Sequence, residues 1–114
     1  MYDWKVISNF YKKKKEIFLK EINSDYEMST LKKFIEIGWP RNKNKLPEVI
    51  KKYHNIAGEL YLINGWIFRN NRLVVPKNLR REMINLIHYN HLGLEKCRNR
   101  AREILFWPMM GKEL

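Results

Sequence analysis

Cysteine and long apolar runs are scarce in this sequence, and each shortage excludes a class of protein. The single cysteine excludes an internal disulfide bond, which fits a reducing compartment. No apolar run is long enough to span a membrane, and the N-terminus lacks the basic and then apolar pattern of a secretory signal. We therefore expect an intracellular protein of the nucleus or cytoplasm, without a membrane partner.

Acidic residues are also few. The chain of 114 residues has 12 acidic residues against 23 lysines and arginines, which gives a formal net charge of +11. Such an excess favours a polyanionic partner, with nucleic acid as the first candidate, although a merely basic soluble protein is the alternative. The length is typical of one small domain, and the 45% of hydrophobic residues allows a packed core.

The first 56 residues have apolar positions spaced by three and four, which predicts helices. A first helix is expected over 2–23. Its lysines 12–15 are interpreted as a solvated block on the helix surface, and a phosphate contact or a short localisation signal is the alternative. A second helix is expected to begin at Ser29 or Thr30 as N-cap and to end at Gly38.

A third helix is expected to start at Pro47, whose missing N–H costs little at a first helical position. Its His54 has no second ligand at a suitable spacing and is interpreted as an ordinary surface or boundary histidine. After Gly58 the pattern changes to short branched and aromatic segments, which predict antiparallel strands near 60–63, 66–69 and 72–75.

Two turn signals separate these strands, Asn64-Gly65 and Asn70-Asn71, and both tolerate the left-handed conformation of a tight hairpin. A sheet this small needs a helix packed on it, and we interpret it as a scaffold. The predicted fold class is therefore mainly α with a small three-stranded antiparallel sheet, an α+β architecture.

Pro76 is expected to open a further helix, whose first turns carry Lys77, Arg80 and Arg81. These cations oppose the positive end of the helix dipole, so helix stability does not explain them. Contact with phosphate explains them, and a harmless exposed cluster is the alternative.

His88 and His91 are spaced as neighbours on one helix face, directly before Gly93. Two imidazoles on the same side form half of a zinc site, although exposed histidines at helix ends are common. Cys97 is a conceivable third ligand, but it falls on the apolar stripe of the next helix, which favours a core position.

That next helix has a strongly basic surface and is expected to end at Trp107-Pro108. Its apolar stripe predicts core packing. Its remaining sides carry the cations Lys96, Arg98, Arg100 and Arg102.

Together these residues resemble a known family. The order of Trp39-Pro40, GELYLINGWIFRNNRLVVPKNLRREMI and HYNHLGLEKCRNRAREILFWPMM resembles the integrase zinc-binding region of gypsy-type LTR retrotransposon polyproteins. The resemblance covers roughly the last two-thirds of the chain, and it divides the chain into a helical linker region, 1–38, and an integrase zinc-binding-like domain, 39–114.

The resemblance implies a helical domain in which two histidines and a Cys-x-x-Cys pair hold one zinc ion. His88 and His91 match the histidines, whereas the cysteine pair has no counterpart before Leu114. Since a tetrahedral site needs four ligands, we expect zinc binding to be weak or absent in this chain. The integrase catalytic core is also absent, so no strand-transfer activity is expected.

Three functions follow from this interpretation. The first is a non-catalytic DNA-binding and assembly fragment of a retrotransposon integrase, with backbone contacts of weak specificity; a helix-turn-helix over 77–106 is a variant of it. The second is an enzyme using His88, His91 and Glu95, which lacks a nucleophile and a phosphate loop. The third is a protein-interaction module with self-association, or a decayed remnant without activity; Trp39, Trp66 and Trp107 permit contacts but are more often core.

Overall fold

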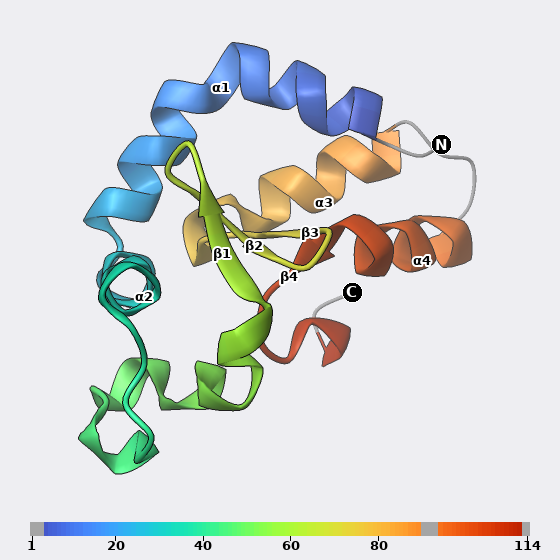
Figure 1. Ribbon diagram of the computed structural model, residues 1–114. Helices are drawn as coiled ribbons and strands as arrows, with labels where there is room; N and C mark the ends of the chain where they lie inside the picture. Colours follow the sequence, from blue (N-terminus) through green and yellow to red (C-terminus); the bar gives the residue numbers. More distant parts are fainter. Residues whose placement is uncertain (1–3, 90–93, 113–114) are drawn as a thin grey trace.

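Two helices, α1 (Trp4–Ser24) and α2 (Tyr26–Ile37), begin the chain in the computed structural model, which describes residues 4–89 and 94–112 (Figure 1). The Asp25 side chain caps α2 by accepting a hydrogen bond of 2.9 Å from the backbone N–H of Met28. The prediction that α2 starts at Ser29 or Thr30 is therefore wrong, because an earlier carboxylate already satisfies an N-terminal amide. The predicted end at Gly38 is confirmed, with a φ of 105° that favours glycine.

Two 3-10 segments follow, η1 (Lys43–Lys45) and η2 (Glu48–Glu59). The helix predicted after Pro47 is thus present, but it is a 3-10 run with a kink at Ile56, where φ is −114°. His54 lies half-buried in η2, with its Nε2 3.0 Å from the carbonyl oxygen of Pro40. This contact confirms the interpretation of His54 as a boundary residue.

The predicted hairpins are confirmed as β1 (Leu60–Ile63), β2 (Trp66–Arg69) and β3 (Arg72–Val74), which pair antiparallel in that order. Asn64, Gly65 and Asn70 adopt the left-handed backbone that the turn signals predict, with φ of 51°, 86° and 51°. The predicted α+β class is therefore confirmed.

A fourth strand, β4 (Leu105–Phe106), lies parallel to β3 and was not predicted. The expected helix through Trp107 ends at Ile104 instead. Leu105 and Trp107 are fully buried and Phe106 between them is half-buried, which is the alternation of a strand. Leu105 pairs with Leu73 of β3. The backbone groups of residues 105–106 therefore form hydrogen bonds with the edge of β3 in place of those that a longer helix would provide.

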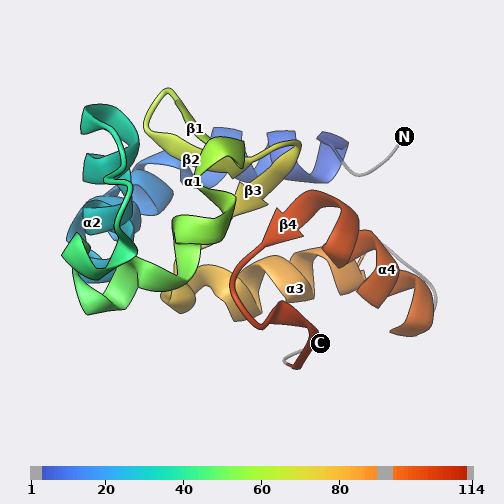
Figure 2. The same ribbon diagram turned by 60° about the horizontal axis from the view of Figure 1, so that its bottom comes forward.

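Pro76 precedes the 3-10 turn η3 (Lys77–Leu79), which leads directly into α3 (Arg80–Tyr89). Helix α4 (Leu94–Ile104) packs against α3, and the chain continues to η4 (Met110–Lys112). Figure 1 shows α3 between α1 and α4, and Figure 2 shows α3 and α4 side by side. Contacts from α1 to this segment include Lys14 with Glu82 of α3, at 3.8 Å.

One hydrophobic cluster joins the helices to the sheet. Phe18 of α1 stacks on Trp66 of β2 with 4.1 Å between ring centroids, and Trp107 is fully buried. Trp66 and Trp107 are thus core residues, as expected of most tryptophans, whereas Trp39 is half-buried. The cluster includes side chains from both sides of residue 38, and the division into 1–38 and 39–114 stays a prediction.

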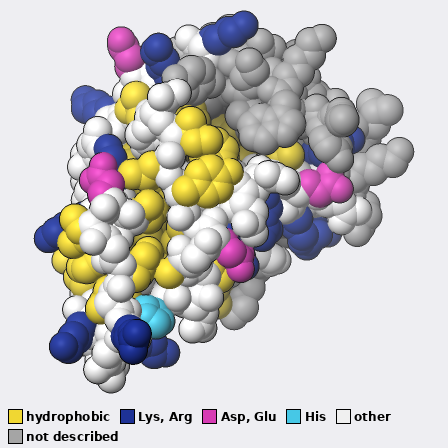
Figure 3. Space-filling model, in the orientation of Figure 1, with side chains coloured by type: hydrophobic (Ala, Val, Ile, Leu, Met, Phe, Trp, Pro, Cys, Tyr) yellow, Lys and Arg dark blue, Asp and Glu magenta, His cyan; other side chains and the backbone are white. Residues whose placement is uncertain are grey.

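One face of the molecule separates charged from apolar side chains. On the face in Figure 3, hydrophobic side chains gather in a central band and most lysine and arginine side chains lie around it. Within the part of the chain that the structure describes, no helix is both long and apolar enough to cross a membrane.

Candidate nucleic-acid interface

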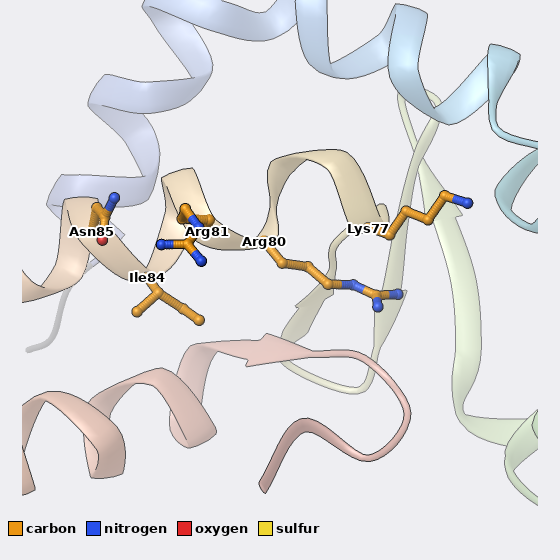
Figure 4. Close-up of a pocket in the computed structure, with 5 residues that line it drawn as sticks. All are labelled: Lys77, Arg80, Arg81, Ile84 and Asn85. Atoms are coloured by element: carbon orange, nitrogen blue, oxygen red, sulfur yellow. The ribbon is translucent and has the colours of Figure 1, made fainter. Parts of the chain in front are cut away.

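The first turns of α3 border a pocket of about 480 Å³ (Figure 4). Its lining residues recur at spacings of three and four, so they form one stripe along η3 and α3. We call this pocket the α3 groove; it is lined by Lys77, Arg80, Arg81, Ile84 and Asn85. The structure therefore brings together three of the cations predicted to contact nucleic acid.

Arg80 is held in place by its neighbours in the fold. Its Nε donates a hydrogen bond of 3.1 Å to the carbonyl oxygen of Val75, and its guanidinium carbon lies 5.4 Å from the ring centroid of the buried Trp107. Arg80 is half-buried, while Lys77 and Arg81 are exposed. Because an arginine side chain carries about 2 kcal/mol of rotamer entropy, this fixing lowers the cost of ordering Arg80 on an anion.

A second pocket of about 210 Å³ adjoins the α3 groove, since Lys77 and Arg80 line both. Two acidic residues, Asp25 and Glu27, lie in its lining. Glu27 accepts a hydrogen bond of 2.5 Å from the hydroxyl of Tyr53 and pairs with Lys52 at 3.2 Å. The two pockets thus form a continuous surface that is basic at one end and contains carboxylates at the other.

Burial of Tyr53, together with its hydrogen bond to Glu27, raises the pKa of the Tyr53 phenol far above its ordinary value. The phenol therefore remains a neutral donor to the carboxylate throughout the physiological range. This arrangement fixes η2 to the start of α2, which forms the acidic side of the second pocket.

The basic residues predicted on α4 differ in exposure. Arg102 is exposed, whereas Arg98 and Arg100 are half-buried. The Nε of Arg98 is buried and has no acceptor among the described residues. The side chain of Lys96 lies outside the described residues, although its backbone is part of α4.

Two further arginines, not singled out from the sequence, lie beside α4. Arg69 and Arg72 face each other across the Asn70-Asn71 turn, and their guanidinium carbons lie 4.7 and 5.3 Å from the Phe106 ring centroid. Arg72 also donates a hydrogen bond of 3.2 Å to the carbonyl oxygen of Arg102. A two-residue hairpin turn places the residues that flank it directly opposite each other. The Asn70-Asn71 turn signal in the sequence could therefore have predicted that Arg69 and Arg72 lie together.

These two arginines are not equally available to a ligand. Arg69 pairs with Glu59 at 2.8 Å, which neutralises it locally. Burial and the neighbouring Arg69 lower the pKa of Arg72, but a guanidinium remains charged under all ordinary conditions. Arg72 and Arg102 thus extend the basic surface from α4 onto the sheet.

The predicted histidine pair falls largely outside what the structure describes. The backbone of His88 belongs to the last turn of α3, its side chain is not described, and His91 lies outside the described residues. Among the residues described, no group of three or more histidine, cysteine, aspartate or glutamate side chains is placed to hold a metal ion. Two imidazoles fit half of a tetrahedral zinc site, and the ligand assignment stays a prediction.

Comparison with known proteins gives two findings. Residues 75–114 match the model of the integrase zinc binding domain. This matched stretch of the chain includes the α3 groove and all of α4. The chain is also 29% identical over 98 residues to the uncharacterized protein K02A2.6 of Caenorhabditis elegans; this match covers 82% of the chain but only 7% of that protein. No solved structure matches the chain. The predicted resemblance to an integrase zinc-binding domain is thus confirmed for residues 75–114.

Proposed function

We propose that the chain is a non-catalytic nucleic-acid-binding and assembly segment of a gypsy-type retrotransposon integrase, acting in DNA integration within the nucleus or cytoplasm. The observation that carries this proposal is the α3 groove, where Lys77, Arg80 and Arg81 line one pocket inside the region that matches integrase zinc binding domains. The net charge of +11 supports the same partner.

The proposed binding mode is contact with backbone phosphate. Exposed lysine and arginine side chains neutralise phosphates without reading bases, so the binding is weakly specific and depends strongly on salt. The exposed Lys77 and Arg81 are the main contacts, with Arg102 and the neighbouring Arg72 as a second group. A zinc ion, where the ligand set is completed, would fix the ends of α3 and α4 through His88 and His91.

The salt dependence of binding tests the proposal. Fluorescence anisotropy with a short duplex whose ends carry hydroxyl groups gives the dissociation constant at several salt concentrations. We expect the logarithm of the association constant, the reciprocal of the dissociation constant, to fall linearly with log salt. Each of the substitutions Lys77→Gln and Arg81→Gln should reduce the steepness of this slope by about 0.9 if that residue neutralises one phosphate. A flat salt response, or no binding at low salt, would contradict the proposal.

The matched control is Lys43→Gln. Lys43 is exposed in η1, outside the lining of both pockets, and its substitution removes the same charge as Lys77→Gln. An equal effect of all three substitutions would show that net charge alone binds the duplex and that the groove has no part in it.

Self-association is a second proposed property. Ile37 is 66% exposed and Ile63 is 49% exposed, and both are large apolar side chains on elements that pack together, α2 and β1. Burial of such side chains between two copies would stabilise a dimer. Size-exclusion chromatography at several concentrations tests this; an elution volume independent of concentration and equal to that of a monomer would exclude it.

A further inference from the structure

The α3 groove contains one cation that is less exposed than its two neighbours. Lys77 and Arg81 are exposed, but Arg80 is half-buried, with its guanidinium lying against Trp107. Figure 4 shows the Arg80 and Lys77 side chains extending away from α3, beyond Arg81 and Asn85. Because Arg80 lines this pocket, an anion that contacts its guanidinium there occupies the pocket. The volume of about 480 Å³ is within the range of small-ligand sites, about 300–1,000 Å³, and suits a nucleotide-sized group.

The second pocket, which adjoins the α3 groove, is unfavourable to a nucleic-acid backbone that continues beyond the groove. Past Lys77 and Arg80, the second pocket is lined by Asp25 and Glu27. Lys52 offsets part of the charge of Glu27, whereas the carboxylate of Asp25 receives only a backbone amide among the contacts of the described residues. A phosphate backbone that ran through both pockets would meet these carboxylates at short range, and like charges repel. A backbone that ends at Arg80 avoids them.

We propose that the α3 groove receives the phosphorylated end of a single nucleic-acid strand, with the terminal phosphate held by the guanidinium of Arg80. This inference rests on the proposed function and names the part of the ligand that the site prefers. A terminal phosphate monoester carries a charge of about −1.5 to −2 near neutral pH, more than the single charge of a backbone diester. Its free oxygens also accept paired hydrogen bonds from the planar guanidinium, an arrangement that a bridging phosphate offers less readily.

Competition binding tests the preference. A short single strand with an internal fluorophore serves as the probe, and unlabelled strands of the same sequence compete for it with a 5′-phosphate, a 3′-phosphate or hydroxyl groups at both ends. We expect at least one phosphorylated strand to bind about tenfold more tightly than the hydroxyl-ended strand, as one additional charge-assisted hydrogen bond provides. Which end shows the gain reveals the direction of the strand.

Two substitutions separate the role of Arg80 from that of the acidic side. Arg80→Lys retains the charge but removes the planar fork, so the preference for the phosphorylated strand should fall below about threefold. Asp25→Asn retains the N-cap of α2, because asparagine and aspartate cap equally well, and removes the repulsion. It should strengthen binding of the hydroxyl-ended strand and so narrow the preference. Lys43→Gln is the control and should leave the preference unchanged.

Several results would overturn the inference. Equal binding of phosphorylated and hydroxyl-ended strands is one, and displacement of the probe by a hexaglutamate peptide more strongly than by any strand is another, since it would assign the groove to acidic protein segments. An unchanged preference in Asp25→Asn, which keeps a side-chain cap at the start of α2, is the third. Salt-dependent binding of the hydroxyl-ended duplex without any end preference would overturn only this inference, whereas no binding of duplex or strand at low salt would overturn the proposed function itself.

Discussion

Gly65 is the position where one added methyl group should test the packing of the hairpin on the helices. Its φ is +86°, and a Cβ built there would lie 3.0 Å from Cδ2 of Leu19 on α1. A left-handed conformation costs an L-residue about 1–2 kcal/mol, and the end of the leucine side chain must shift as well. For a chain of this size, about 4 °C of thermal midpoint correspond to each kcal/mol. We therefore expect Gly65→Ala to lower the midpoint of thermal unfolding by roughly 4–8 °C, measured by circular dichroism.

Gly58→Ala is the matched control for this measurement. Gly58 lies in η2, it has no positive φ, and an added Cβ meets nothing within 4 Å. Alanine restricts the unfolded chain more than glycine, so the expected change is zero or a stabilisation of about 0.4–1 kcal/mol. Equal losses at Gly58 and Gly65, or no loss at Gly65, would refute the claim that the turn conformation and its contact with α1 stabilise the fold.

Two predictions concern the acidic side of the second pocket. Asp25→Ala should lower the free energy of unfolding by about 0.5–2 kcal/mol in urea, whereas Asp25→Asn should lower it far less, because asparagine replaces the cap; equal losses would contradict the capping role. Burial first, and then Glu27, raise the pKa of Tyr53 above its ordinary value of 10.0, so the folded state keeps a proton that the unfolded state loses. Stability should therefore fall above about pH 10 with a slope from this residue of about 1.4 kcal/mol per pH unit, and Tyr53→Phe should remove that part of the slope in urea unfolding at pH 9–11.

The sheet shows which parts of the fold local sequence determines. The first three strands follow from Asn64-Gly65 and Asn70-Asn71, because Asn64, Gly65 and Asn70 adopt the left-handed backbone of two-residue turns, and such turns fix register over a few residues. Strand β4 pairs with β3 across some thirty positions of sequence, from Leu73 to Leu105, and no local pattern contains that pairing. Two residues of alternation are also too few to distinguish a strand from the end of a helix.

The candidate site divides in the same way. The basic stripe of the α3 groove was predictable, because residues at spacings of three and four share a face once the helix is recognised. The acidic lining was not, since Asp25 and Glu27 come from α2, about fifty residues away. Asp25 was also missed as a cap because Ser29 and Thr30 offered competing cap residues further along, and sequence alone does not rank them.

The groove and the predicted zinc ligand His88 lie toward opposite ends of α3. The segment that leads into η3 and α3 is held by the hydrogen bond of 3.1 Å from the Val75 N–H to the Phe106 carbonyl oxygen, and the segment that follows α4 is held by the pairing of Leu105 with Leu73. His88 follows Arg80 by eight residues, about 12 Å along the helix axis. The geometry of the groove therefore depends on β3 and β4, while a metal bound through the histidines would stabilise the opposite end of α3.

This separation predicts that metal and nucleic acid act on different properties of the chain. Zinc, if the two imidazoles bind it, should raise the thermal midpoint, because a ligand of the folded state stabilises that state, and EDTA should reverse the increase. The affinity for the hydroxyl-ended duplex and its salt slope should be the same with zinc and with EDTA. His88→Gln combined with His91→Gln should remove any shift of the midpoint and leave duplex binding unchanged. Loss of duplex binding in this double variant, with the helical content intact by circular dichroism, would show that the histidine end of α3 and α4 also holds the groove together.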